Sequence, residues 1–239
     1  MNAWRKEVRR ALDELRDAVV PERREKAAFY FPSSMEVLGV PVPPLRRVVR
    51  RLSREFKQAS PDDVMGLGRM LLDTRIHEAR QVAFELIGGR HDLIAGLDGP
   101  TVEALGAGND NWASVDCFCV SITGQAWRDG RVVDADVRRW AASEDRWWRR
   151  TAVVSTVPLN MKSRGGRGDP SRTLDICARV ASDRDAMVAK GLSWALRSLV
   201  PVDPDPVRSF IEEHGDGLQA LVRREVTNKL STGRKNPRS

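Results

Sequence analysis

Cysteine and histidine are too scarce in this chain to build a disulfide scaffold or a recognisable metal site. The 239 residues include three cysteines, Cys117, Cys119 and Cys177, and three histidines that lie far apart in the sequence. No CxxC pair is present, and nothing near the histidines has metal-ligand spacing, so we expect no metal ion. The glycine-rich P-loop and GxGxxG motifs are absent too, and we expect no organic cofactor.

Long apolar runs are also missing. None approaches the roughly 18 residues that a membrane-spanning helix needs. The first ten residues, MNAWRKEVRR, contain no apolar core of a secretory signal. We therefore expect a soluble, cytoplasmic protein that has no membrane partner.

Positive charge is in excess and comes mainly from arginine. Lysine and arginine number 40 against 33 acidic residues, which gives a net charge of +7, and only seven of the 40 are lysine. Because the planar guanidinium pairs well with phosphate, this balance favours a phosphate-bearing partner such as a nucleic acid. GC-rich coding raises arginine content in the same way without any functional meaning.

Apolar residues recur three and four positions apart through most of the chain, which is the spacing of amphipathic helices. Stretches that alternate at strand spacing are few and short. Proline and glycine separate the helical segments, and Ser60, Asp169 and Asp205 each precede a proline as candidate helix caps. The pattern predicts an all-α protein with about a dozen helices of roughly 8 to 18 residues and no sheet.

Three helical segments, 74–83, 144–153 and 184–193, align with one another and place Arg80, Arg150 and Lys190 in register. Their spacing fits a repeat of about 35 to 40 residues, as in HEAT or armadillo α-solenoids. In such a solenoid the three basic residues would form a stripe on a concave basic face. The alternatives are an irregular helical bundle, and basic residues that pair with acids on neighbouring helices. We expect one domain over residues 1–232 and a basic, flexible tail over residues 233–239.

The segment from Asn109 to Cys119 places a tryptophan and a carboxylate on one helix face. Asn109 or Asp110 can cap a helix that begins near Trp112, and Asp116 follows four residues later. Such a pair can serve an active site. It can equally be a half-buried tryptophan beside an aspartate that is paired with arginine.

Two further tryptophan-containing segments could contact a nucleic acid. Residues 147–150 join Trp147 and Trp148 to Arg149 and Arg150, which can stack on bases and clamp phosphates. Successive helical residues lie about 100° apart, so at most one of the two arginines faces a given ligand. Trp194 has small neighbours that would let a ligand approach its ring, although a tryptophan packed in the core is the default expectation.

Taken in order, these motifs resemble the AlkD-like DNA alkylation repair glycosylases, a family built from HEAT-like repeats. The resemblance spans roughly residues 27–230 and rests on five segments. Residues 38–46 look like the family's LG(V/I)xxPxLR motif and residues 111–116 like WxxVD. Residues 143–152, 190–197 and 221–225 are similar to its SxxxWxxRxA, KAxxWxLR and SKREA segments.

The resemblance implies a role for each matching residue. Asp116 matches the catalytic carboxylate, Trp112 and Trp194 the aromatics that flank the lesion, Arg150 the arginine that holds the backbone, and Tyr30 an N-terminal aromatic. The expected substrate is duplex DNA with N3- or N7-alkylated purines, bound by a monomer in a cleft that does not enclose the base. The protein would then associate with the nucleoid when it is on DNA. The candidate DNA-contacting residues are Tyr30, Arg46, Arg47, Arg80, Arg149, Lys190 and Arg197.

The chain departs from the family pattern at three places. Pro41-Val42 stand where some members have polar residues, and Gly191 replaces an alanine. The Asn160–Arg172 loop is long and rich in glycine and arginine, so it either binds phosphate or is disordered. Two other functions stay open, a non-catalytic HEAT-repeat protein that binds distorted DNA or RNA, and a HEAT scaffold for proteins.

Overall fold

The computed structural model describes residues 2–237, and the regular structure in that range is helical. Sixteen α-helices, a π-helical turn η1 (Cys119–Thr123) and a 3-10 turn η2 (Lys162–Arg164) follow one another along it. The described residues form no strand, and their one β-type pairing is an isolated bridge between Glu36 and Ile76. Twelve of the α-helices have between 8 and 15 residues. The prediction of an all-α fold is confirmed.

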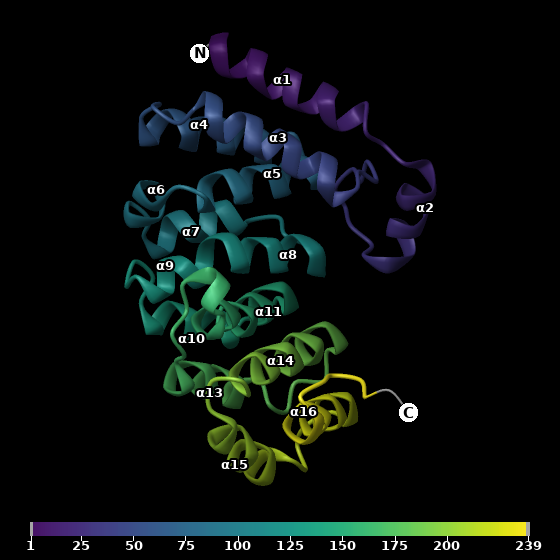
Figure 1. The fold of residues 1–239 in the computed structure, drawn as a ribbon, viewed down its shortest axis with the longest axis vertical. Coiled ribbons are helices and arrows are strands. Elements are labelled where there is room, and N and C mark those ends of the chain that lie inside the picture. The colour runs from purple at the N-terminus through teal and green to yellow at the C-terminus, as the bar shows by residue number, and fades with distance from the viewer. Residues whose placement is uncertain (1, 238–239) are drawn as a thin grey trace. The chain divides into compact units, whose positions relative to one another are not determined.

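The chain divides into two compact units between Ile122 and Thr123, and each unit is described by itself. In the first unit, α4 and α5 form a helical hairpin, and α5 also packs against α3 and α8. Figure 1 shows α2 apart from the layers formed by α1, α3 and α5, and Ala27 is its one buried residue. The helices are α1 (Asn2–Arg16), α2 (Pro21–Tyr30), α3 (Val42–Glu55), α4 (Pro61–Asp73), α5 (His77–Gly88), α6 (His91–Ala95), α7 (Gly99–Gly106) and α8 (Trp112–Phe118).

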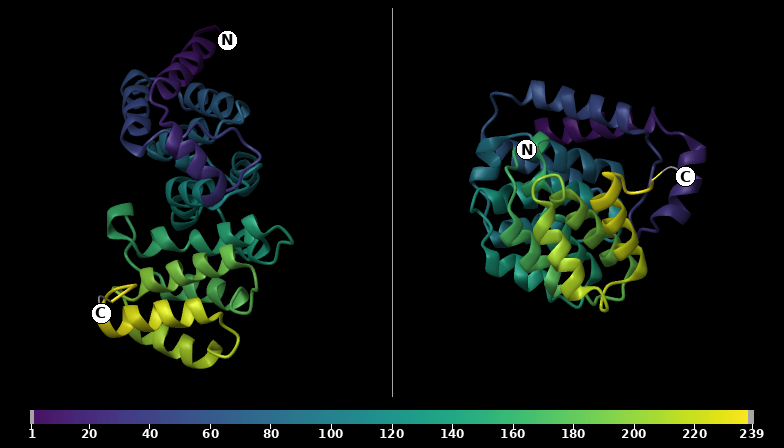
Figure 2. Two further views of the ribbon diagram at one scale, coloured as in Figure 1. Left: turned by 90° about the vertical axis from the view of Figure 1, so that its right-hand side faces the viewer. Right: turned by 60° about the horizontal axis from the view of Figure 1, so that its bottom comes forward.

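The second unit is built from successive helix pairs, as in HEAT-like repeats. Helix α10 packs with α11, α13 with α14, and α15 with α16, while α14 also contacts α11 and α16. Figure 2 (left) shows α14 and α16 as adjacent layers. The helices are α9 (Gly124–Arg128), α10 (Asp134–Ala141), α11 (Arg146–Val154), α12 (Val157–Asn160), α13 (Pro170–Arg179), α14 (Ala186–Leu199), α15 (Pro204–His214) and α16 (Ala220–Thr232).

Each unit has its own apolar core, which the helical spacing of the sequence supplies. In the first unit the rings of Phe84 on α5 and Phe118 on α8 lie 5.0 Å apart and are both fully buried. A side chain of this size contributes about 1.5–3 kcal/mol when it is removed from water. Its packing therefore fixes α8, which carries Trp112 and Asp116, against α5.

The predicted helix caps are confirmed at two positions and wrong at a third. Ser60 and Asp169 each accept a hydrogen bond from a backbone N–H in the first turn of the helix that follows. At α15, however, the cap is Asp203, and the helix begins at Pro204 rather than Pro206. Pro206 fits inside the first turn because the N–H that it lacks would have no helical partner there.

The tail after α16 folds back onto that helix over its described part. Lys235 Nζ lies 3.1 Å from the buried carboxylate of Glu225, and the side-chain amide of Asn228 donates to the Lys235 carbonyl at 3.1 Å. Residues 238 and 239 of the predicted tail lie outside the described residues. The single domain over residues 1–232 and the flexibility of the tail stay predictions.

Neither a membrane helix nor a metal cluster is found within residues 2–237. No helix there is both long and apolar enough to cross a bilayer. No group of three or more histidine, cysteine, aspartate or glutamate side chains in the same range could hold a metal ion.

Candidate functional site

Helix α8 begins where the sequence predicted, but a different residue caps it. Asn111 accepts a hydrogen bond from the backbone N–H of Ser114 at 2.9 Å, so neither Asn109 nor Asp110 is the cap. Trp112 is then the first residue of the helix, and Asp116 stands one turn further along. Both side chains are half-buried, and their i, i+4 spacing puts them on one face of α8.

The indole of Trp112 is held by the end of α2. Its Nε1–H donates to the carbonyl oxygen of Tyr30 at 2.9 Å. The ring centroids of Tyr30 and Phe31 lie 5.6 and 5.9 Å from that of Trp112, both edge to face. Two predicted site residues, Tyr30 and Trp112, are therefore in contact, although 82 positions separate them in the sequence.

A cavity of about 620 Å³ opens beside this aromatic contact. It lies between α2, the segment 37–42, α5 and the start of α8, entirely within the first unit, and we call it the α2 cavity. Its lining includes Tyr30, Phe31, Val40, His77, Gln81 and Trp112. Ligand-binding pockets commonly have volumes of about 300–1,000 Å³, so this cavity is large enough for a small aromatic molecule.

His77 sits in the lining of the α2 cavity and is only 3% exposed. Its ring stacks on Phe31 with centroids 4.9 Å apart, and within the described residues its buried Nδ1 has no hydrogen-bond partner. Burial lowers the pKa of His77 and outweighs the opposing effect of the neighbouring carboxylates of Glu78 and Asp110. The imidazole is therefore neutral at neutral pH.

The segment that follows α2 is tied to the rest of the unit by two carboxylates. Glu78 on α5 is 3% exposed and accepts the backbone N–H groups of Leu38, Gly39 and Val40 at 3.0, 2.7 and 3.2 Å. Further upstream, Asp110 accepts the Ser33 hydroxyl at 2.6 Å and the backbone N–H of Ser34. These contacts fix the course of the chain around the α2 cavity.

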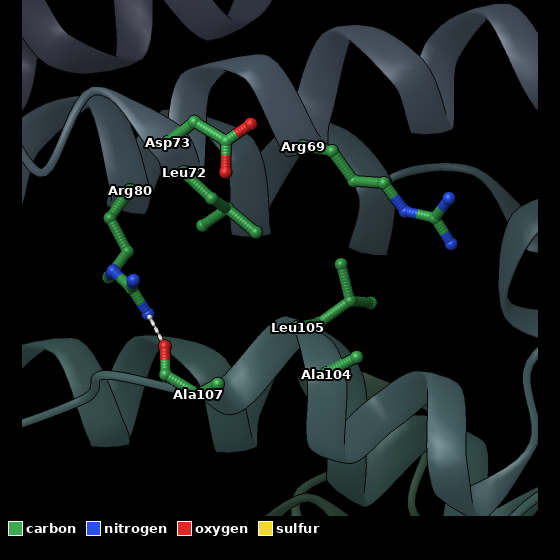
Figure 3. Close-up of a pocket in the computed structure, with 7 residues that line it drawn as sticks. All are labelled: Arg69, Leu72, Asp73, Arg80, Ala104, Leu105 and Ala107. Carbon is green, nitrogen blue, oxygen red and sulfur yellow. Dashed lines mark hydrogen bonds between the residues drawn. The ribbon is translucent and has the colours of Figure 1, made fainter.

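Arg80 was predicted to contact DNA as part of an exposed basic stripe. In the structure Arg80 is buried instead. The side chain is 6% exposed, and its guanidinium donates to the Ala107 carbonyl at 2.9 Å and to the Asn109 side chain at 3.1 Å. Arg80 lines a cavity of about 330 Å³ beside α7, which we call the α7 cavity. Figure 3 shows its side chain at one edge of this cavity, bonded to the Ala107 carbonyl. Burial lowers the pKa of Arg80. Its contacts support the turn that leads into α8.

In the second unit, Arg150 and Trp194 lie on two helices that pack against each other, α11 and α14. Arg150 is 4% exposed, and its guanidinium donates to the Met187 carbonyl on α14. Trp194 is half-buried on α14. Two of the three basic residues in register, Arg80 and Arg150, are therefore buried, and only Lys190 is exposed.

Gly191 has a packing reason to depart from the family's alanine. A Cβ atom there would meet Val153 at 3.0 Å and Val154 at 3.2 Å, both on α11. The missing side chain lets α11 and α14 approach closely. This close approach of the two helices helps to hold Arg150 of α11 against α14.

Trp147 and Trp148 are both half-buried, so neither is fully inside. Trp148 packs on Trp140 with ring centroids 5.3 Å apart, and the guanidinium of Arg146 lies 5.5 Å from the ring centre of Trp147. Arg149 binds Asp183 at 2.7 Å and the Ser143 carbonyl at 2.9 Å. This arginine therefore links the α10–α11 connection to the start of α14.

The other predicted DNA-contacting residues differ in how open they are. Arg46, Arg47 and Lys190 are exposed. Of these, Arg46 forms an ion pair, with its Nε 3.5 Å from Oε2 of Glu85. Arg197 is mostly buried beside Ser193 and Glu225, with nitrogen–oxygen distances of 3.1 and 3.7 Å. Burial lowers its pKa although Glu225 acts in the opposite direction.

The Asn160–Arg172 loop is folded rather than disordered. The buried amide of Asn160 donates to the Thr173 hydroxyl at 2.9 Å and accepts the backbone N–H of Asp169 at 3.0 Å. Lys162, Arg164 and Arg167 are exposed on it. That the loop contacts DNA stays a prediction.

Comparison with known proteins identifies the family. The profile of a family described as DNA alkylation repair enzyme matches residues 11–230, which spans both units. The chain belongs to this DNA alkylation repair family. Membership gives it a role in DNA repair and makes DNA its partner.

The fold agrees with a solved structure from Enterococcus faecalis described as a predicted DNA alkylation repair enzyme. The TM-score is 0.70 at 18% sequence identity, and the match covers 90% of this chain and 97% of that one. At this identity the likeness shows the fold, a HEAT-like helical repeat. No curated protein matches the chain.

Sequence reasoning missed Phe31, His77, Glu78 and Asp110 as parts of this region. The sequence around Glu78, with His77 before it and Arg80 two positions after it, gives no signal that this carboxylate is buried. The contacts of Phe31 and Asp110 bridge more than 40 positions, so spacing along the chain cannot reveal them.

Proposed function

We propose that this DNA alkylation repair protein is a glycosylase that hydrolyses the N-glycosidic bond of N3- or N7-alkylated purines in duplex DNA. One observation carries the proposal. Asp116 stands one turn after Trp112 on α8, and that helix is fixed by the Asn111 cap and by the bond from Trp112 to Tyr30. A carboxylate beside an anchored aromatic ring is what the reaction requires.

The reaction depends on stabilisation of a positive charge on the sugar more than on a general acid. A purine alkylated at N3 or N7 is cationic, so it leaves as a neutral base with the electron pair of the C1′–N bond. The sugar left behind becomes oxocarbenium-like. Asp116 would stabilise that positive charge and orient the water whose oxygen bonds to C1′, with the proton of the water passing to the carboxylate and then to solvent.

Trp112 and Trp194 would each supply an aromatic face to the lesion. The negative quadrupole of an indole face attracts a cation by about 0.5–2 kcal/mol. We assign Arg150 as a fixed positive charge of the site, since its burial and its bond to Met187 hold it in place.

Exposure decides which of the predicted residues we assign to direct contact with DNA. Arg46, Arg47 and Lys190 are exposed, as is Tyr30 at 72%, and we assign these four to direct contact. Arg149 and Arg197 are engaged with Asp183 and Glu225. They would contact a phosphate only while they also remain bound to these carboxylates. We no longer assign Arg80 to DNA contact, because it is buried.

A base-release assay tests the proposal directly. Duplex DNA methylated at purines is incubated with the protein, and free 3-methyladenine and 7-methylguanine are measured by chromatography. We expect release at least about tenfold above the spontaneous rate, which corresponds to about 1.4 kcal/mol of barrier. Tight binding without release would instead show a non-catalytic nucleic-acid-binding HEAT protein. Failure to bind DNA would point to a protein scaffold.

A further inference from the structure

The Asn160–Arg172 loop carries three cations that the proposed function does not use. Lys162, Arg164 and Arg167 are exposed, and none of them forms an ion pair with any residue in the described range 2–237. We call them the loop cations. Other exposed arginines of the second unit pair with aspartates, among them Arg138, Arg139, Arg146, Arg179 and Arg208. The protein therefore supplies anions to those arginines but not to the loop cations.

The backbone of the loop is held in one shape. The side chain of Asn160 accepts the backbone N–H of Asp169 at 3.0 Å, which ties the two ends of the loop together. An added Cβ at Gly166 would lie 2.2 Å from the Pro158 carbonyl oxygen, so the loop packs backbone against backbone at this point. A loop that is already ordered loses little further backbone entropy when it binds a ligand.

A pocket of about 360 Å³ lies beside the loop, next to the end of α9 and the start of α13 and within the second unit. Arg128, Arg167 and Arg172 line it, together with Asp129 and Asp169. Nε of Arg128 lies 2.9 Å from Asp129, and Nε of Arg172 lies 3.7 Å from Asp169. Because each of these pairs is neutral as a whole, the net positive charge of the pocket comes from Arg167.

The DNA backbone is an anion that several neighbouring cations can bind at once. Each strand has one phosphate per about 3.4 Å of helix axis, and a guanidinium can bind a phosphate through two parallel hydrogen bonds. DNA is also the partner that family membership gives to this chain. The sequence left phosphate binding and disorder as alternatives for this loop, and its ordered backbone removes the second.

We propose that the Asn160–Arg172 loop is a second DNA-binding site, in which the loop cations bind phosphates of the backbone. None of the three belongs to the reaction site assigned above or to the DNA-contacting residues predicted from the sequence. Because phosphate contacts carry no sequence information, the loop holds damaged and undamaged duplex alike. The inference goes beyond the proposed function, since it rests on DNA as the partner and does not depend on base release.

Removal of the three charges tests this assignment. The loop variant, Lys162→Gln/Arg164→Gln/Arg167→Gln, changes only exposed side chains. Its affinity for an undamaged duplex is measured by fluorescence anisotropy at several salt concentrations. One lost phosphate contact reduces the slope of log K against log salt by about 0.9, so three reduce it by about 2.7. A second variant, Arg164→Lys/Arg167→Lys, keeps every charge and should keep the slope of the parent.

The matched control removes three charges from helices of the same unit. It is Arg139→Gln/Arg179→Gln/Arg208→Gln, in which each arginine is exposed but binds an aspartate. The control has the same net charge as the loop variant, so it separates a phosphate-binding site from the general attraction of a basic protein to DNA. We expect its slope to stay within about 0.5 of that of the parent.

We expect the loop variant to bind the undamaged duplex at least about tenfold more weakly than the parent at about 0.1 M salt. Affinity and slope like those of the parent would overturn the proposal. An equal loss in the control would overturn it too, because net charge alone would then explain the effect. If the parent binds DNA but releases no base, the glycosylase assignment fails, while the salt slopes still test the loop.

Discussion

Glu78 shows how one buried carboxylate can set the path of a neighbouring segment. Its two oxygens accept three consecutive backbone N–H groups, from Leu38 to Val40. Gly39 has φ = +85°, and a Cβ there would lie 2.6 Å from the Arg24 backbone nitrogen, so only glycine fits this close turn. The segment leads directly to Val42, where α3 begins.

We expect Glu78→Ala to destabilise the protein by about 3–5 kcal/mol, because it leaves several buried N–H groups without an acceptor. Urea unfolding measures the loss. The exposed Glu212→Gln on α15 is the control and should stay within about 0.5 kcal/mol of the parent. A small loss for Glu78→Ala would mean that water or another group replaces the carboxylate.

Arg80 and Arg47 give opposite predictions for DNA binding. Arg47 is exposed, so Arg47→Ala should lower affinity and reduce the slope of log K against log salt by about 0.9, the value of one lost phosphate contact. Arg80 is buried against Ala107 and Asn109. Arg80→Ala should leave that slope unchanged and instead lower stability. Fluorescence anisotropy at several salt concentrations measures both slopes, and a reduced slope in Arg80→Ala would contradict its assignment.

At the scale of the element, the carboxylate of Asp110 holds the segment that follows α2. This attachment weakens at acid pH. Burial alone would raise the pKa of Asp110, but the hydrogen bonds from Ser33 and Ser34 outweigh it and hold the pKa below its ordinary value. A carboxyl group with a lowered native pKa stabilises the fold above its unfolded pKa of about 3.9, and that contribution is lost as the pH falls through the native pKa.

Asp110→Asn should therefore cost about 1–2 kcal/mol at pH 7. The difference from the parent should shrink below about pH 4, as the parent's own carboxyl takes up a proton. Unfolding in urea at pH 7, 5 and 3.5 measures this trend. A constant difference at all three values would show that Asp110 acts through shape rather than charge.

Helix packing makes two glycines differ in what they tolerate. An added Cβ at Gly88, the last residue of α5, would lie 2.1 Å from the Ser121 carbonyl oxygen, which is backbone and cannot easily move. At Gly191 the neighbours are side-chain methyl groups at 3.0 and 3.2 Å. Gly88→Ala should lose about 2 kcal/mol or more, and Gly191→Ala should stay within about 1 kcal/mol of the parent. Equal losses in denaturant unfolding would contradict this account.

Local patterns predicted the elements well where the physics is local. Ser60 and Asp169 cap their helices as expected, and Trp112 begins α8 as expected. The cap of α8 is Asn111, but the sequence analysis assigned it to Asn109 or Asp110. All three residue types can cap a helix, and only the fold shows that Asn109 and Asp110 bind other partners. Asp110 is taken by Ser33 and Asn109 by Arg80.

For the whole molecule, the all-α HEAT-like fold followed from periodicity and from motifs in order, and the family match over residues 11–230 agrees with it. The burial of Arg80 and Arg150 could not be predicted from periodicity or motifs. A repeat register places Arg80 and Arg150 on equivalent helices, yet whether such a residue faces water depends on helices that are distant in the sequence. The α2 cavity escaped prediction for the same reason, since α2, α5 and α8 all contribute to it.

The rate of base release by Asp116→Asn tests the account most directly. The substitution keeps the size of the side chain but removes the charge that would stabilise the sugar cation. Under single-turnover conditions with saturating protein, we expect release of 7-methylguanine to fall by about 10²–10³-fold, while the affinity for the same duplex stays within about threefold. Release at the parent rate would contradict the assignment of Asp116 as the catalytic carboxylate.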